Sequence, residues 1–337
     1  MQLLDISAIK KIIHTIGLNS FYNRLVSQLE CDFKRWHDFY KSPRHAIHYN
    51  HGVIELMPCS DDELYAFKYV NGHPNNTSQG KLSVVGIGLL ADVKTGYPLM
   101  MSEMTLLTAI RTAAVGALGA KYLAKKNSIH LAIIGCGAQS EFQATAMKSV
   151  HPIDKITIFD IDEYAMEKFS TNLSTQFKQI EQCDSVIDAV LHADIIITVT
   201  AANLNATLFT ENHISPGTHI HAMGGDGPDK TELGASLLKQ SKLIVEFSPQ
   251  SLVEGEVQQL DASHIHAELW QIINGEKTAR ENNHEITIFD SVGFAMEDYS
   301  ILKLIYEISQ ELRIGSHIDL IPNLKDPKNL FGLLKSD

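Results

Sequence analysis

The sequence predicts an α/β protein in which a Rossmann-type, doubly wound parallel sheet is joined to an α+β domain. Three observations lead to this prediction. From residue 129 onward, short and wholly apolar runs alternate with helical segments, which is typical of a parallel sheet covered by helices on both faces. Before residue 129, segments alternate between polar and apolar residues and break at turn residues, as antiparallel hairpins do. A turn with two glycines, Gly135 and Gly137, directly follows the first apolar run.

Length and composition limit the possible classes of protein. With 337 residues, the chain can form two domains that each have a hydrophobic core. Hydrophobic residues make up 44% of it, but no apolar run approaches the ~18 residues that a membrane span needs. The first residues lack the features of a signal peptide. The net charge of -12 argues against a nucleic-acid partner, because surfaces that bind nucleic acid are normally basic. We therefore expect neither a membrane nor a nucleic-acid partner.

The cysteines and histidines do not indicate a metal site. Cys31, Cys59, Cys136 and Cys183 are far apart, and no pair has the CxxC spacing. None of the 16 histidines belongs to an HExxH motif, so no metal is expected. Because unpaired thiols are typical of a reducing compartment, we expect a cytoplasmic protein.

The first domain is expected to span residues 1–128, and residues 316–337 are expected to return to it because the alternation of strands and helices stops near 312. Asp5 or Ser7 is the expected N-cap of its first helix, and Thr95-Gly96 the turn of its second hairpin. The predicted elements are amphipathic helices at 5–17 and 21–36, hairpins at 52–74 and 81–104, and a long, mostly buried helix at 105–124.

The second domain is expected to span residues 129–315 and to hold the parallel sheet. Residues 128–150 predict a strand, a glycine turn and a helix in succession. Further apolar runs predict strands within 155–162, 185–202, 218–227, 242–248 and 286–293.

The glycine turn is a candidate dinucleotide site. Gly135 would permit the tight turn, and Gly137 would let a pyrophosphate approach the backbone at the helix N-terminus. Ser140 stands where the motif usually has a third glycine. Asp160 ends the next strand, 25 residues after Gly135, where an acid would bind ribose hydroxyls and repel the 2′-phosphate of NADP. These features favour NAD, whereas the alternatives are an ordinary strand–helix turn and an N-cap role for Asp160.

Three cations of the first domain lie among apolar or small neighbours. Arg44, Lys68 and Arg111 need partners, because burying an unpaired charge is costly. They could form an anion site for a substrate carboxylate, since arginine offers a bidentate fork. They could equally form internal ion pairs, with Glu55, Glu103 and Asp92 as the candidate partners.

Asp226 stands in the stretch "GGDGP", which excludes a helix interior or a paired strand because glycine and proline disfavour both. One interpretation is an ordinary turn. The other is that a ligand lies against this backbone and that Asp226 faces it.

The stretches that decide between these interpretations resemble a known family. They are "GVIELMP", "FKYVNGHPNN", "ADVKTGYPL", "SEMTLLTAIRTAA", "IIGCGAQ" and "GGDGPDKTEL". The sequence resembles the ornithine cyclodeaminase/mu-crystallin family, which includes ketimine reductases, from about residue 40 to residue 300. The stretches "KYVNGHP" and "GGDGPDKTEL" are specific, whereas the glycine turn is not.

The resemblance implies roles for the matching residues. Arg44, Lys68 and Arg111 would hold the α-carboxylate of an amino-acid substrate, Val292 would line the substrate pocket, and Asp226 would be the catalytic acid/base. The glycine pair before Asp226 would let the nicotinamide lie against the loop. The cofactor contacts, besides Gly135 and Gly137, would fall on Ser83, Ala138, Gln139, Asp160, Thr200, Met223, Gly224, Gly225, Lys230 and Ser291. Two positions depart from the family's pattern: Ser83 stands where threonine is expected, and Asp229 where glycine is common.

The resemblance also implies an activity and an assembly state. The activity is a lyase reaction of proline biosynthesis or ornithine degradation, from L-ornithine to L-proline and ammonia, with NAD as a recycled hydride carrier. The δ-amine must lose a proton before it attacks, so an acid/base is needed. Asp226 is the first candidate and Glu55 the second, unless Glu55 pairs with Lys68 or Arg111.

The alternative functions are an NAD-dependent amino-acid dehydrogenase or ketimine reductase, and a non-catalytic crystallin-like binding protein. The first domain would bind substrate and mediate a homodimer.

Overall fold

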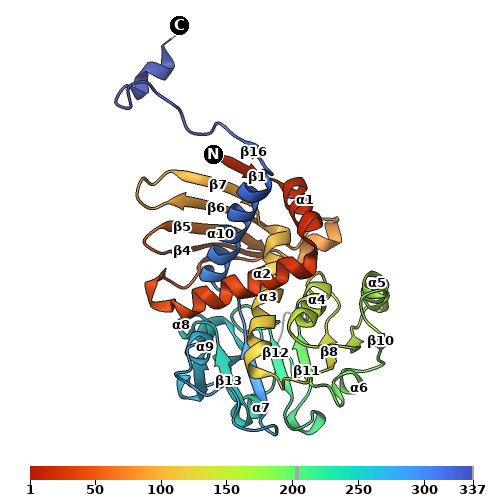
Figure 1. Cartoon of the computed structure of the whole chain (residues 1–337). Helices are drawn as coiled ribbons and strands as arrows, with labels where there is room; N and C mark the ends of the chain where they lie inside the picture. The colour runs from red at the N-terminus through yellow and green to blue at the C-terminus, as the bar shows by residue number, and fades with distance from the viewer. Residues whose placement is uncertain (202–204, 336–337) are drawn as a thin grey trace.

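The computed structural model describes residues 1–201 and 205–335, and it contains two eight-stranded sheets (Figure 1). The first sheet has the strand order β16-β1-β7-β6-β5-β4-β2, with β3 paired to β4. Its pairs are antiparallel except β1 with β7. Both predicted hairpins are confirmed, as β4–β5 and β6–β7, and Gly96, with a φ of 73°, lies in the turn of the second. The strands are β1 Gln2–Leu4, β2 Tyr40–Lys41, β3 His45–Tyr49, β4 Gly52–Ser60, β5 Leu64–Gly72, β6 Val84–Asp92, β7 Pro98–Glu103 and β16 Ser316–His317.

The two faces of this sheet have different environments. Buried and exposed residues alternate along β4 and β5, so that Lys68 points inward and its neighbour Tyr69 outward. The inner face packs against α10 (Ala295–Leu312), which in turn packs against α2 (Leu18–Lys34). On the outer face, Leu56, Tyr69 and Ile87 lie opposite one another on three neighbouring strands. The exposed apolar side chains of this face are Ile47, Tyr49, Leu56, Tyr65, Tyr69, Val85 and Ile87.

The second sheet confirms the predicted Rossmann-type fold. All of its strands are parallel, in the order β10-β9-β8-β11-β12-β15-β13-β14, and β10 to β12 follow the 3-2-1-4-5 order of a dinucleotide-binding fold. β15 lies between β12 and β13 although it comes last in the chain. Its central strands are buried along their whole length, which explains why they are wholly apolar runs or nearly so. The strands are β8 His130–Ile134, β9 Lys155–Phe159, β10 Gln179–Gln182, β11 Ile195–Thr198, β12 His219–Ala222, β13 Lys242–Val245, β14 Ile265–Glu268 and β15 Thr287–Asp290.

The three helices of the first domain that the sequence predicts, at 5–17, 21–36 and 105–124, begin and end within three residues of those bounds. Asp5 is the N-cap of α1, and its carboxylate accepts a hydrogen bond from the Ala8 N–H group. Among the described residues, no helix is long and apolar enough to cross a membrane. Besides α2 and α10, the helices are α1 Ile6–Ile16, α3 Thr105–Leu123, α4 Ser140–Val150, α5 Glu163–Leu173, α6 Val186–Val190, α7 Ala235–Gln240, α8 Ser248–Glu254 and α9 Leu269–Ile273.

Two segments connect the sheets, namely α3 with the chain that leads to β8, and the β15–α10 segment. The helix α3 is almost wholly buried and packs against elements of both sheets, including β6, β12 and β15. The helix α10 packs on β4, β5 and β6 rather than on the parallel sheet. We keep the division into two domains, with its boundaries at 128 and 315, as a proposal.

The C-terminal segment returns to the first sheet only briefly. β16 pairs with β1, as the prediction for 316–337 requires. The chain then leaves the body, and a short 3₁₀ helix (Leu330–Leu334) lies well away from both sheets (Figure 1).

Candidate functional site

A cavity of about 640 Å³ lies where the two domains meet, and it brings most of the predicted site residues together. The first domain contributes β3 to β6 and α3 to its lining, whereas the second contributes the turn after β8 and the loops after β11, β12 and β15. The predicted site residues that line it are Arg44, Glu55, Lys68, Ser83, Arg111, Gly137, Ala138, Gln139, Thr200, Met223, Gly224, Asp226, Lys230, Ser291 and Val292. Gly135, Asp160 and Gly225 do not line it.

Lys68 and Arg111 share a carboxylate at the inner end of this cavity. Lys68 on β5 is 1% exposed, and its Nζ lies 2.8 Å from Asp298 Oδ2. Arg111 on α3 places Nε 2.8 Å from Asp298 Oδ1 and Nη1 2.9 Å from Glu297 Oε2. Burial and the neighbouring charge of Arg111 lower the pKa of Lys68 to about 8, although Asp298 opposes the shift. The lysine is therefore close to losing its charge at neutral to alkaline pH.

Arg44 lies between β2 and β3 and is held by two other carboxylates. Its guanidinium lies 3.1 Å from Glu55 and 3.1 Å from Glu254, and Nη2 donates hydrogen bonds to the carbonyl oxygens of Val292 and Gly293 at 2.6 and 2.7 Å. Burial alone would lower the pKa of Arg44, but the two carboxylates outweigh it and raise that pKa. Nη1 and Nη2 thus donate to the protein, whereas Nε lies near Glu254 without a hydrogen bond among the described residues.

The ion-pair interpretation of the three cations is confirmed, but only one of its named partners takes part. Glu55 pairs with Arg44 rather than with Lys68 or Arg111. Glu103 instead accepts a hydrogen bond from the Leu106 N–H group, and Asp92 from Thr95 in the hairpin turn. Ion pairing does not exclude an anion site, because all three cations also line the cavity.

The acids that hold the cations were not predicted from the sequence; they are Glu254, Glu297 and Asp298. One signal was available for two of them. The run "GFAMEDYSIL" places Glu297 and Asp298 inside an otherwise apolar helix, where buried acids need cationic partners. Glu254, at the end of the short helix α8, has no comparable local signal.

The glycine turn has the shape that a dinucleotide needs. Gly135 has a φ of 101°, and a Cβ there would lie 2.6 Å from the Val199 carbonyl oxygen. Beside Gly137 there is open space. Ser140, at the start of α4, is fully buried, and its hydroxyl donates to the Gly137 carbonyl oxygen at 2.8 Å. The Oε1 atom of Gln139 is buried without a hydrogen-bond partner among the described residues. A pyrophosphate and its ribose fit this turn, because it offers open backbone at a helix N-terminus.

Asp160 lies at the end of β9, beside the glycine turn. Its carboxylate accepts hydrogen bonds from the backbone N–H groups of Cys136 at 2.6 Å and Asp162 at 3.0 Å. The N-cap of α5 is Asp162, so the alternative role considered for Asp160 belongs to its neighbour. Contact between Asp160 and a ribose stays a prediction.

The GGDGP loop after β12 rests on two buried acids. A Cβ on Gly224 would lie 2.0 Å from the Glu232 carboxylate, and one on Gly225 would lie 2.8 Å from Glu256 Oε1. The glycine pair therefore lets the backbone approach these carboxylates, so a cofactor would have to approach the loop from its other side. Asp229 has a φ of 60°, a conformation that glycine and aspartate tolerate, which explains why aspartate can stand there.

Asp226 itself points into the open part of the cavity. Its side chain is 56% exposed, and its carboxylate lies 2.7 Å from Lys230 Nζ. Electrostatic interactions connect it with Arg44 and Glu254, so it lies near the end of the cavity that those two residues occupy. An accessible carboxylate at this position can exchange a proton with a bound amine.

Buried carboxylates also hold the remaining cofactor residues in place. Glu232 accepts a hydrogen bond from the Thr200 N–H group at 2.7 Å, and Glu246 accepts one from the Ser291 hydroxyl at 2.5 Å. Burial raises the pKa of Glu232, and burial together with the charge of Asp290 raises the pKa of Glu256 to about 8. Within the described part of the chain, no group of three or more His, Cys, Asp or Glu side chains could hold a metal ion.

Comparisons with known proteins agree with this geometry. The model of the ornithine cyclodeaminase/mu-crystallin family matches residues 8–312. An ornithine cyclodeaminase of Agrobacterium tumefaciens (strain Ach5) is 48% identical over 331 residues, which cover 98% of this chain and 93% of the relative. A Thermococcus litoralis Δ1-pyrroline-2-carboxylate reductase, solved with NADH and L-proline, is 34% identical with a TM-score of 0.88 and covers 94% of this chain and 100% of its own. A lysine cyclodeaminase, solved to explain its recognition of L-lysine, L-ornithine and L-2,4-diaminobutyric acid, is 25% identical with a TM-score of 0.93 and covers 99% of both chains.

Proposed function

Because the chain belongs to the ornithine cyclodeaminase/mu-crystallin family, we propose that it is an ornithine cyclodeaminase, which converts L-ornithine to L-proline and ammonia. One observation carries this proposal. A single cavity joins a buried cation cluster, an accessible carboxylate and an open dinucleotide turn. These are the parts that a redox reaction at the α-carbon of an amino acid requires. The cofactor is NAD, as the NADH-bound reductase at 34% identity supports.

The cation cluster would bind the α-carboxylate of the substrate. Lys68 and Arg111 lie side by side, joined through Asp298. A substrate carboxylate would compete with Asp298 and Glu297 for these two buried cations, and the low local dielectric strengthens each of these attractions. Binding there would leave the α-carbon of the substrate directed at the loops of the second domain.

NAD, when bound, would take the hydride of the α-carbon and later return it, so that it is recycled within each turnover. The residues of the chain would carry the proton transfers. Asp226 would take a proton from the δ-ammonium group, and the free δ-amine would then attack the α-carbon of the imine. Departure of the α-nitrogen as ammonia would leave a cyclic imine, whose reduction gives proline. Asp226 can pass this proton to water, since its side chain is half-exposed, while Lys230, 2.7 Å away, holds the carboxylate in place.

The same cavity offers carboxylates for the distal amine of a diamino acid. Glu55 and Glu254 both pair with Arg44, and Asp226 lies near them. A cluster of acids at this position favours a substrate that carries a second positive charge. This supports a diamino acid over alanine or proline as the substrate.

Two alternatives use the same parts of the site. An NAD-dependent amino-acid dehydrogenase or ketimine reductase would release or consume NADH with every turnover. A crystallin-like binding protein would bind these ligands without turning them over. The accessible Asp226 favours an enzyme, because it has no structural partner except Lys230 among the hydrogen bonds of the described residues.

The experiment that decides is turnover of ornithine deuterated at the α-carbon with only a trace of NAD. We expect proline that retains the deuterium, ammonia in equal amount and no accumulation of NADH. Stoichiometric NADH with a 2-oxo acid would identify a dehydrogenase. Full activity after rigorous removal of NAD, or loss of the label to water, would contradict the recycled hydride.

We also propose that the protein is a cytoplasmic homodimer that acts in proline biosynthesis or ornithine degradation. Its four cysteines are unpaired, as in proteins of a reducing compartment. The outer face of the first sheet supports a two-fold dimer, because an exposed row of apolar side chains such as Leu56, Tyr69 and Ile87 is typical of a surface that another copy covers.

A further inference from the structure

We propose that residues 318–334 form an arm that binds a second copy of this chain and stabilises the dimer by exchange between the two subunits. This inference rests on the homodimer proposed above, and it concerns the segment that leaves the body after β16. The arm thus lies on the surface of the partner subunit, and by symmetry each subunit both donates an arm and receives one.

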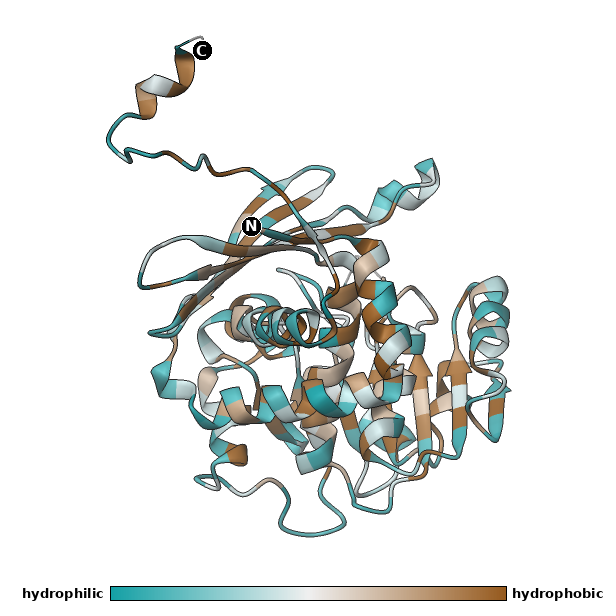
Figure 2. Cartoon of the chain, turned by 45° about the horizontal axis from the view of Figure 1, so that its top comes forward, coloured by the Kyte–Doolittle hydropathy of each residue, from teal (hydrophilic) through white to brown (hydrophobic). Residues whose placement is uncertain are grey.

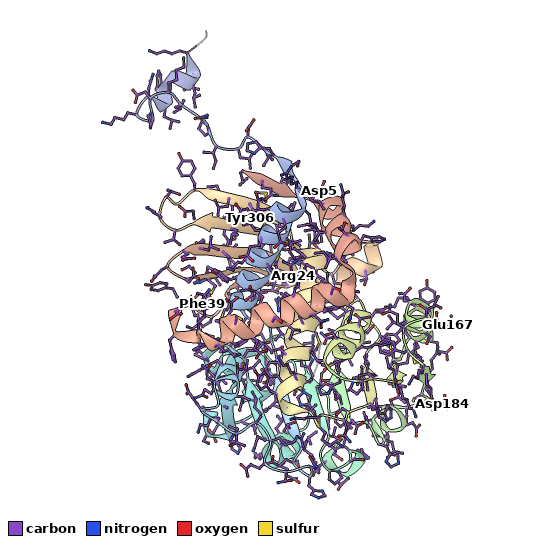
Figure 3. All side chains as sticks on the ribbon, in the orientation of Figure 1. Asp5, Arg24, Phe39, Glu167, Asp184 and Tyr306 are labelled. Carbon is purple, nitrogen blue, oxygen red and sulfur yellow. The ribbon has the colours of Figure 1, made fainter. Side chains whose placement is uncertain are left out.

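The arm is separated from its own subunit. The last hydrogen bonds to the body join Ile318 to the main chain of Met1. From Asp319 to Lys335, the polar contacts that the structure gives are local, such as the Asn329 side chain with the Gly332 N–H group. Figure 3 shows the side chains of this segment standing clear of those of the body.

The arm nevertheless carries the composition of a docking segment. Phe331 is 70% exposed and Leu334 78%, both in a 3₁₀ helix of five residues. So short a helix is not stable in water by itself, because helix formation has a costly nucleus. The exposed large apolar side chains of the arm are Leu320, Ile321, Leu330, Phe331, Leu333 and Leu334. Such a density of apolar groups indicates that the arm lies on another surface.

The position of the arm favours binding to a second copy of the chain rather than to a surface of its own subunit. The arm starts at β16, the edge strand of the first sheet, and runs away from the body (Figures 1 and 2). The exposed apolar face proposed for dimer formation belongs to this same sheet. When two such faces meet, an arm that starts at the sheet edge and points outward reaches the partner before it can return to its own body.

The match to the family model ends before the arm, whereas the alignment with a relative extends over most of it. The family model ends at residue 312, before β16. The alignment with the Agrobacterium tumefaciens ornithine cyclodeaminase spans 331 of the 337 residues, so it must include most of the arm. The arm is therefore a feature that this chain shares with that cyclodeaminase beyond the common fold.

A photo-crosslinking amino acid at position 331 of the full-length chain tests the exchange directly. We expect illumination of the dimer to give a covalent product of twice the subunit mass, and the crosslinked peptide to come from the partner. A control with the same group at Tyr164, which is 74% exposed on the far side of the second domain, should give no such product. Crosslinks within one subunit only, or none at all, would overturn the proposal.

Sedimentation and subunit exchange test the energetic contribution. We expect the double variant Leu330→Asp/Phe331→Asp, and a chain that ends at residue 317, to weaken the dimer at least roughly 100-fold, since several large side chains lose their burial. Tyr164→Asp is the matched surface control. An unchanged dissociation constant of the dimer in both arm variants would refute the exchange of arms, although the dimer itself would still be supported. A monomeric wild-type chain would refute the dimer as well, whereas ornithine turnover would report on the proposed function separately.

Discussion

Protonation of Lys68 should control the binding of the substrate carboxylate. The side chain is buried beside Arg111, and the two effects together lower its pKa to about 8. At pH 7 about 90% of the molecules then carry a charged Lys68, whereas at pH 9 about 90% carry a neutral one. An anion bound next to this amine restores the charge, because an opposite charge favours the protonated form. Binding of a carboxylate should therefore take up about 0.1 proton at pH 7 and about 0.9 at pH 9.

Pentanoate is a suitable probe because it has a carboxylate but no amine that titrates in this range. Isothermal titration calorimetry of the protein with saturating NAD, in buffers of different ionisation enthalpy, measures the proton uptake directly. The affinity should also fall about tenfold for each pH unit above 8. Lys68→Arg is the control, because a guanidinium stays charged up to about pH 12 and should show almost no uptake. No uptake at pH 9 in the wild type, or equal uptake in Lys68→Arg, would refute this reasoning.

The lowered pKa of Lys68 also makes the stability of the protein depend on pH. A lysine in the unfolded chain has its ordinary pKa near 10.5, so between pH 8 and 10.5 the unfolded state binds more protons than the folded state. The free energy of unfolding should therefore rise with pH in this window, by up to about 3 kcal/mol from this residue. Chemical denaturation of the ligand-free protein at pH 8 and pH 10, compared with Lys68→Arg, measures the difference.

Three further predictions concern residues that follow the carboxyl ends of strands β9 and β12. Asp226→Asn should lower the rate of ammonia release by roughly 10²–10⁴-fold, the usual contribution of a general base, and near-normal turnover would place the base elsewhere. Asp160→Ser should reduce the preference for NAD over NADP in kcat/KM, and an unchanged ratio would mean that Asp160 does not contact the ribose. Gly224→Ala should lower the free energy of unfolding by about 1–3 kcal/mol, because the new Cβ would displace the buried Glu232 carboxylate from its hydrogen bonds. Gly227→Ala is the control: a Cβ there meets nothing within 4 Å, so the free energy of unfolding should stay nearly unchanged.

Much of the fold could be predicted because its signals are local. The apolar runs of β8 and β11 and the two hairpins of the first sheet are periodic patterns within single segments. The strands that were missed are short or lie at sheet edges, such as β1 and β2. Their pairing depends on partners far along the chain, and three or two residues give no detectable period. The position of α10 on the first sheet is likewise a matter of tertiary packing, which no local pattern in the sequence indicates.

The candidate site could be predicted as a set of residues but not as a network. Arg44, Lys68 and Arg111 were identified because a cation among apolar residues is unusual in any sequence. Their partners Glu254 and Asp298 lie about two hundred positions away, and only the fold brings them together. The resemblance supplied roles for single residues, whereas ion pairs between them depend on three-dimensional distances that no single sequence contains.

The place of β15 has a consequence for how the chain folds as it is synthesised. β15 fills the position between β12 and β13, so the parallel sheet has a gap until residue 290 has left the ribosome. The first sheet is completed even later in synthesis, because α10 covers its inner face and β16 pairs with β1. Although domains commonly fold one after another from the N-terminus, neither half of this chain can be completed early. The growing polypeptide must therefore keep apolar core surface of both sheets exposed until β15 and α10 have emerged, and a chain terminated before them lacks a complete domain.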